Sequence, residues 1–155
     1  MAVKVEVNYC NSVLCDLSVP ETFAYLADAE KSVPPNFPGL ENFTKSGTDL
    51  YHWEFEKVGQ GGYDIQIHLA TRIIPKAPDQ IQLSSIAGGK SNGMLQGHWR
   101  LGTKGEKTEA TFDIKLDLEL PLPFFLKAVA APVAQKELTK LFDRYLTNVG
   151  KALTK

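Results

Sequence analysis

The sequence predicts an α+β fold in which a curved antiparallel sheet of about six or seven strands wraps around a long C-terminal helix. Three observations predict it. Apolar and polar residues alternate along most of the chain from Val3 onward, glycine-containing turns separate the alternating segments, and the apolar period changes to three and four residues after Pro123. With 155 residues, 43% of them hydrophobic, the whole chain 1–155 is expected to form one domain.

The first elements are expected to be a strand and a short helix. Odd-numbered residues are apolar over most of 3–19, which predicts a strand with one solvent-exposed face. The strand is expected to bend around Asn11. Pro20 suits the first turn of a helix over 20–29. The segment 33–40 carries three prolines and is therefore predicted to be an irregular loop.

A hairpin is expected next. Residues 50–57 and 63–69 alternate apolar and polar side chains on either side of glycines within 59–62. If paired residue numbers sum to 120, Trp53 faces Ile67 and the apolar sides of both strands register.

Three further strands complete the predicted sheet. Residues 81–85, 95–101 and 110–120 each have an apolar and a polar face, and the turn at 88–92 separates the first two. The short connections predict an antiparallel meander.

The C-terminal segment is predicted to be one helix over 133–153. A helix of this length measures about 32 Å, against a radius of gyration of roughly 15 Å for a chain of this size, so it must cross nearly the whole sheet. Pro132 lacks a backbone donor and is predicted to bend or break the helix.

One helix is too narrow to cover the concave side of such a sheet, so the inward side chains either fill the interior or line a pocket. We predict that these side chains bind a ligand. They are Tyr51, Trp53, Phe55, Tyr63, Ile65, Ile67, Leu83, Ser85, Leu95, Trp99, Phe112 and Ile114 on the strands, with Leu138, Phe142 and Tyr145 on the helix. Phe37 and Leu40 are predicted to lie at the mouth; alternatively they cap the core, or touch a membrane or a protein partner transiently.

No catalytic residue is assigned, because the inward set contains no His, Asp or Glu, the groups that acid–base catalysis most often uses. Its tyrosines and serine suit holding a ligand oxygen. In the register above His52 faces His68, but no third ligand is supplied, so neither a metal nor a cofactor is expected. These points weigh against an enzyme.

Charge and hydropathy exclude other classes of protein. Seventeen Lys and Arg against eighteen Asp and Glu give a net charge of −1, which argues against nucleic-acid binding. The apolar stretches 120–126 and 128–134 are short and contain prolines, so no stable membrane insertion is expected. The first ten residues lack the apolar run of a secretory signal, and a cytoplasmic location is therefore expected.

Four short segments resemble the START-like (SRPBCC) superfamily, and the likeness spans essentially the whole chain. They are YLAD at 25–28, FPGL at 37–40, LQGHWRL at 95–101 and LFDRYLTNV at 141–149. The superfamily includes polyketide cyclase/dehydrases, lipid-transport proteins and the coenzyme-Q-binding proteins, to which GHWRL is similar in particular. The resemblance implies a helix-grip fold with a hydrophobic cavity between the sheet and the long helix.

Three functions remain open at this stage. The first is binding or carrying a lipid, quinone or polyketide-like molecule in an internal cavity. The second is a cyclase or dehydrase acting on a polyketide-like substrate, for which Tyr51 and Tyr63 would converge in the cavity. The third is a small adaptor with a packed interior that recruits a protein partner through Phe37, Leu40 and the proline-rich loop.

Overall fold

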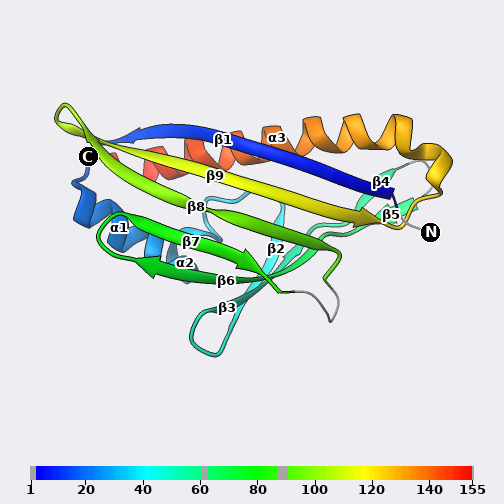
Figure 1. The fold of residues 1–155 in the computed structure, drawn as a ribbon, viewed down its shortest axis with the longest axis horizontal. Helices are drawn as coiled ribbons and strands as arrows, with labels where there is room; N and C mark the ends of the chain where they lie inside the picture. Colours follow the sequence, from blue (N-terminus) through cyan, green and yellow to red (C-terminus); the bar gives the residue numbers. More distant parts are fainter. Residues whose placement is uncertain (1–2, 61–62, 87–90, 155) are drawn as a thin grey trace.

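The computed structural model of the protein describes residues 3–60, 63–86 and 91–154 (Figure 1). Its strands are β1 (Val3–Cys15), β2 (Leu40–Ser46), β3 (Leu50–Phe55), β4 (Val58–Gln60), β5 (Tyr63–Ile65), β6 (His68–Lys76), β7 (Gln80–Ser85), β8 (Gly93–Lys104) and β9 (Lys107–Leu120). Its helices are α1 (Val19–Ala27), α2 (Ala29–Ser32), the 3-10 turn η1 (Phe124–Leu126) and α3 (Lys127–Ala152).

The main sheet has seven antiparallel strands in the order β1-β9-β8-β7-β6-β3-β2, and β4 and β5 form a separate small hairpin. The long helix α3 runs along the sheet, with η1 at the right-hand end of Figure 1 and the C-terminus at the left. The predicted α+β class and the arrangement of one sheet around one long helix are confirmed.

The first strand lies beside the last one. Val3 pairs with Leu120 and Cys15 with Thr108 along the full length of β1 and β9. The predicted alternation holds, since Val3, Val5 and Val7 are buried and their even-numbered neighbours are exposed, but the strand ends at Cys15, four residues earlier than predicted. A capping box at Ser18 then starts α1.

Strand β2 was not predicted from the sequence. Most of its side chains are exposed, and only Leu40 and Phe43 are half-buried, because β2 is an edge strand with little apolar alternation to reveal it. The irregular loop predicted for 33–40 accordingly ends at Gly39.

The predicted hairpin register is wrong by two residues. In β3 and β6 the paired numbers sum to 122, so Trp53 pairs with Leu69 instead of Ile67. The small β4–β5 hairpin, which the alternation did not reveal, lengthens the connection. A two-residue shift leaves each side chain on its predicted face, but His52 now faces Ala70 and the predicted His52–His68 pair does not form.

Parts of the two predicted glycine turns, residues 61–62 and 88–90, lie outside the described residues.

Helix α3 continues through Pro132, so the predicted break is wrong. Proline removes the amide that would bond to the carbonyl of Ala128. Ala128 and Pro132 are both exposed, so water can donate a hydrogen bond to the Ala128 carbonyl. Packing of the following turns against the sheet keeps the helix continuous. Within the described residues, no helix combines the length and the apolar composition that crossing a bilayer requires.

We predict that Gly97 is essential to the close pairing of β8 and β9. Its φ is 149°, and an added Cβ would lie 2.1 Å from the carbonyl oxygen of Asp113 and 2.7 Å from Cα of Ile114. Gly97→Ala should therefore lower the free energy of unfolding by roughly 3 kcal/mol or more. Gly102→Ala, on the same strand and with no atom within 4 Å of the added carbon, is the control and should change it by less than about 0.5 kcal/mol. Equal urea midpoints for the two variants would contradict the close approach at Gly97.

Candidate functional site

Aromatic side chains fill much of the interior beneath the C-terminal half of α3. Phe37 stacks on Tyr145 with ring centroids 4.5 Å apart, and Trp99 lies 4.7 Å from Phe112. The indole nitrogen of Trp53 donates to Oγ1 of Thr71 at 2.7 Å, so its polar atom is satisfied inside the core. We call this group the aromatic cluster; its members are Tyr9, Phe37, Trp53, Phe55, Trp99, Phe112, Phe142 and Tyr145.

A pocket of about 260 Å³ lies at the other end of the interior. We call it the end pocket. It opens beneath the N-terminal half of α3, where β9 ends and the β4–β5 hairpin lies nearby (Figure 1). Its lining is mostly apolar and comprises Gly39, Phe55, Glu56, Val58, Ile65, Ile67, Leu118, Leu120, Leu122, Ala130, Val133, Ala134, Glu137, Leu138 and Leu141.

The end pocket exists because the inward side chains of α3 change in size along the helix. Ala130 and Ala134 line the pocket, whereas Phe142 and Tyr145, farther along the same helix, are buried in the aromatic cluster. Alanine reaches only a short way toward the sheet, so space remains beneath the first turns. The helix therefore leaves one end of the interior open and closes the other.

Four of the predicted ligand-binding residues line the end pocket: Phe55, Ile65, Ile67 and Leu138. Five more, Trp53, Trp99, Phe112, Phe142 and Tyr145, belong to the aromatic cluster and do not line it. The structure thus divides the predicted set between a filled region and an open one. That these residues contact a ligand stays a prediction.

The remaining members of that set lie outside the lining of the end pocket. Tyr51, Leu83, Leu95 and Ile114 are buried in the core. Ser85 is half-buried, and its hydroxyl accepts from the Leu95 amide at 2.5 Å and donates to the Leu95 carbonyl at 3.0 Å. The backbone of Tyr63 lies in β5, but its side chain is outside the description.

Neither residue predicted at the mouth lines the end pocket. Phe37 is 4% exposed and packs against Trp53 and Tyr145 within the aromatic cluster, which agrees with the alternative that it caps the core. Leu40 is half-buried in β2, and the adjacent Gly39 reaches the pocket in its place.

Two carboxylates at the pocket correct the expectation that no Asp or Glu would face it. Glu56 and Glu137 belong to the lining, and both are exposed. The carboxylate of Glu137 lies 3.7 Å from the ammonium of Lys140. Their exposure places them at the rim, where they can meet the polar end of a ligand whose apolar part is inside.

Several lining residues that were not predicted to bind a ligand lie within predicted elements, and Ala130 lies just outside one. Leu118 and Leu120 continue the apolar face of β9, and Ala134 is the second residue of the predicted helix. Ala130 extends the inward stripe of α3 beyond the predicted start at 133. The helical spacing of these alanines was a usable signal. Ala130 was missed because Pro132 suggested that the helix began after it.

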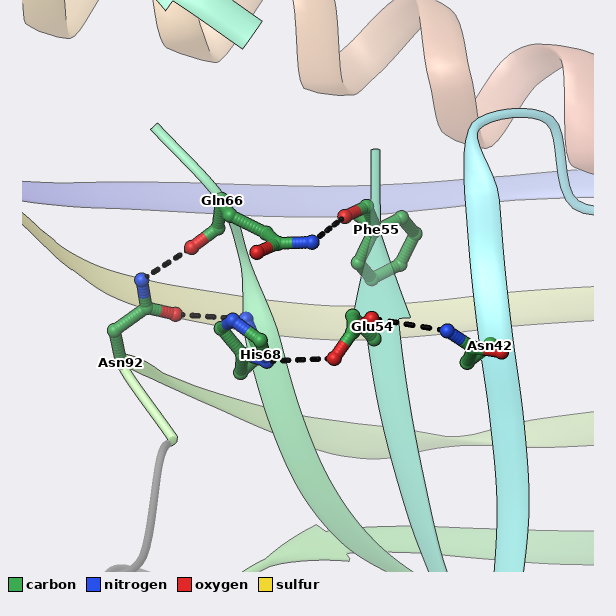
Figure 2. Close-up of polar contacts among 6 residues, drawn as sticks. All are labelled: Asn42, Glu54, Phe55, Gln66, His68 and Asn92. Carbon is green, nitrogen blue, oxygen red and sulfur yellow. Dashed lines mark hydrogen bonds and ion pairs between the residues drawn. The ribbon is translucent and has the colours of Figure 1, made fainter. Parts of the chain in front are cut away.

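A chain of hydrogen bonds holds the wall of the end pocket in place (Figure 2). The side chain of Asn92 accepts from the His68 amide at 2.9 Å and donates to the Gln66 carbonyl at 2.7 Å. Gln66 donates to the Phe55 carbonyl at 2.8 Å, and the Phe55 amide donates to the Ile67 carbonyl at 3.0 Å. These bonds fix Phe55 and Ile67, two lining residues, where β5 passes into β6.

Glu54 and His68 extend this chain on the outer face of the sheet. His68 Nδ1 lies 3.6 Å from Oε2 of Glu54, whose other oxygen accepts from Asn42 at 2.9 Å (Figure 2). Glu54 alternates with the buried Trp53 and Phe55, so the pair points away from the pocket. We interpret it as a brace between β2, β3 and β6 with no role toward a pocket ligand.

A tyrosine–carboxylate contact fastens the C-terminal half of α3 to β1. The hydroxyl of Tyr9 donates to Oδ1 of Asp143 at 2.5 Å. Burial, with a further contribution from this bond, raises the pKa of Tyr9 well above its ordinary value, and burial does the same for the pKa of Tyr145. Burial also raises the pKa of the Cys15 thiol to about 11.

Comparison with solved structures shows that the fold is the START-like (SRPBCC) helix-grip fold. An aromatase/cyclase, Zhui from Streptomyces sp. R1128, matches with a TM-score of 0.58 and 17% identity over 96% of this chain and 93% of that one. A START superfamily protein from Mycobacterium smegmatis matches with a TM-score of 0.58 and 15% identity over 94% and 96% of the two chains.

The di-domain aromatase/cyclase StfQ of the steffimycin biosynthetic pathway matches with a TM-score of 0.60 and 14% identity. The match covers 96% of this chain and 51% of StfQ, so this chain spans about half the length of StfQ. No protein-family model and no curated protein matches the sequence. At these identities the likeness establishes the fold alone.

We predict that Asn92 stabilises the pocket wall. Asn92→Ala removes two bonds to half-buried backbone groups and should lower the free energy of unfolding by about 1–3 kcal/mol. Asn42→Ala, which removes an exposed bond to Glu54, is the control and should have an effect below about 0.5 kcal/mol. Hydrogen exchange should speed up at His68 in the Asn92 variant only; unchanged exchange there would contradict the bracing role.

Alkaline pH should destabilise the fold through its buried tyrosines. Because the pKa of Tyr9 and of Tyr145 is higher in the folded state than the unfolded value of about 10, their contribution is fully present below pH 10 and is lost as the pH rises above it. Urea midpoints should therefore fall as the pH is raised from about 10 to 11.5. The fall should be shallower in the double variant Tyr9→Phe/Tyr145→Phe, and identical slopes would refute this origin.

Proposed function

We propose that this protein binds an apolar or amphipathic small molecule in the end pocket and releases it chemically unchanged. The observation that carries the proposal is the pocket itself, a space of about 260 Å³ with mostly apolar walls between the sheet and α3. Such sites commonly combine an apolar lining with a few polar groups at one side. Here Glu56 and Glu137 supply that polar side.

The size of the pocket limits how much of a ligand can enter. An engineered apolar cavity of about 150 Å³ in another protein holds one benzene, so the end pocket has room for one or two rings or a short stretch of acyl chain. A lipid, a quinone or a polyketide-like molecule would place this part inside. The rest of the molecule would extend past the rim toward solvent.

The polar groups near the pocket favour binding over catalysis. Among the described side chains that line it, the titratable ones are Glu56 and Glu137, and both are exposed to solvent. General acid–base catalysis needs a group held within hydrogen-bond reach of the reacting atoms in a site that excludes bulk water. Tyr51, considered for a cyclase, is buried against Phe43 away from the pocket, with ring centroids 5.2 Å apart.

The fold and its interior support the two alternative functions, a cyclase and an adaptor, to different degrees. Zhui and StfQ are aromatase/cyclases, so turnover of a polyketide-like substrate is the alternative that the fold keeps open. An adaptor with a wholly packed interior is less well supported, because the end pocket is not filled by side chains. We further propose that residues 1–155 act as one binding unit that needs no metal or cofactor.

The bound molecule can be identified directly. Purified protein is extracted with organic solvent, and the extract is compared by mass spectrometry with the extract of a variant whose pocket is filled. We expect an apolar compound that is absent from the filled variant. Incubating the protein with that compound should return it unaltered; a new product would favour the cyclase alternative.

Filling the pocket should weaken binding. Ala134→Phe adds a ring to the pocket-lining face of α3 and should weaken binding of the naphthalene-based fluorophore N-phenyl-1-naphthylamine by about tenfold or more, because steric overlap removes the space the probe uses. Ala152→Phe adds the same ring at an exposed position near the end of α3 and is the control. Fluorescence titration gives both affinities. Equal affinity in the two variants, or no binding by the unmodified protein, would overturn the proposal.

A further inference from the structure

Five exposed apolar side chains gather around the start of α3. Phe125 is 79% exposed, Val129 62%, Phe124 59%, Val58 58% and Val133 40%. Phe124 and Phe125 lie in η1, and Val58 and Val133 both line the end pocket. We call these five residues the apolar tip. The start of α3 and the β4–β5 hairpin lie together at the right-hand end of Figure 1.

The apolar tip interrupts the normal pattern of an amphipathic helix. Solvent-facing positions farther along α3, such as Lys140, Asp143 and Thr147, are polar, as expected for a helix with one buried face. In the first turns, the exposed positions include Val129 and Pro132 beside Lys127. This part of the helix has two apolar sides, one lining the end pocket and one facing outward.

The charge of η1 and the first turns of α3 is basic. From 120 to 136 the chain contains Lys127 and Lys136 and no Asp or Glu, although the whole chain has eighteen acids and seventeen bases. The ammonium of Lys127 lies 5.6 Å from the centre of the Phe124 ring. Beside Val58 the charge is balanced, because the exposed Glu56 and Lys57 both precede it. The acidic Glu137 follows this segment and lies beside Lys140.

We propose that the apolar tip docks this protein on the surface of an anionic lipid bilayer. Exposed Phe side chains beside lysines are the composition that partitions into the boundary between headgroups and acyl chains, and each lysine near an anionic surface strengthens attachment by about fivefold. The two phenylalanines enter this boundary while the lysine ammonium groups stay at the headgroups. No part of α3 crosses the membrane.

The exposed area favours a bilayer over a second copy of the chain. Taking each of the five side chains to be as large as a phenylalanine of about 200 Å², their exposed fractions amount to less than about 600 Å². A stable interface buries about 800 Å² on each partner. A small protruding apolar end suits shallow insertion, for which no complementary surface is needed.

Docking at this place would turn the end pocket toward the membrane. Val58 and Val133 belong both to the apolar tip and to the pocket lining, so a molecule leaving the bilayer would meet apolar surface along its path. The docking proposal does not require that a ligand be bound, and its test measures attachment to lipid alone. It can therefore fail while the binding function stands, and the reverse also holds.

The test is co-sedimentation with sucrose-loaded vesicles made of phosphatidylcholine alone or with about 30% phosphatidylserine, at about 0.1 M salt. We expect attachment to the anionic vesicles to exceed attachment to the neutral ones by about tenfold. The double variant Phe124→Ser/Phe125→Ser should lose about tenfold or more of the attachment. Lys127→Gln should lose about fivefold on anionic vesicles and little on neutral ones.

Leu14→Ser is the matched control. Leu14 is 48% exposed and lies near the end of β1, eleven residues or about 36 Å along the strand from Val3, which pairs with Leu120 next to the tip. This variant removes an exposed apolar side chain from the opposite end of the sheet and should attach like the unmodified protein. Circular dichroism confirms that each variant is folded; Phe125→Ser alone replaces the double variant if that one is not.

Three results would overturn docking on a bilayer, and a fourth would overturn its anionic character. The first is absence of attachment to anionic vesicles by the unmodified protein, and the second is equal attachment by the tip variant and the control. The third is a dimer in light scattering that the tip variant converts to a monomer without any attachment to vesicles, which would assign the tip to a second copy. Equal attachment to both vesicle types would overturn the assignment of an anionic surface.

Discussion

The packing of one helix against one concave sheet governs the interior of this protein. The sheet is broader than α3, so the side chains on the inward stripe of the helix decide how much of the space beneath it is filled. Phe142 and Tyr145 reach the aromatic cluster and close one end. Ala130 and Ala134 do not reach across, and a pocket of about 260 Å³ remains at the other end. A change of residue size along one stripe thus separates the stable part of the core from the part available to a ligand.

The two ends of the molecule are held in different ways. The C-terminal half of α3 is fixed by ring contacts and by the bond from Tyr9 to Asp143. The pocket end depends on bonds from Asn92 and Gln66 to backbone atoms, which hold the strands where their regular pairing stops. Polar bonds are suited to this position because the wall must stay in place without side chains filling the space it encloses.

The pocket and the apolar tip gather at the same end of the fold. Both involve the first turns of α3, and Val58 and Val133 take part in each. The opposite end carries the well-packed aromatic interior and the C-terminus of the helix. If the proposed function and the proposed docking both hold, a ligand would be exchanged where the protein meets the lipid, and the stable end would have no part in that exchange.

Alternation along the strands and the helical period after Pro123 were sufficient to predict the α+β class, the antiparallel sheet and the long terminal helix, because burial of one face leaves a regular mark on the sequence. The edge strand β2 has little apolar alternation, so only the tertiary structure reveals it. Strand register could not be derived either, since the β4–β5 hairpin changes the pairing of Trp53 without altering which face it occupies. Alternation also identified Phe55, Ile65 and Ile67 as inward but could not tell pocket from core. That distinction depends on which side chains meet across the space between helix and sheet, and this is fixed only when both are in place.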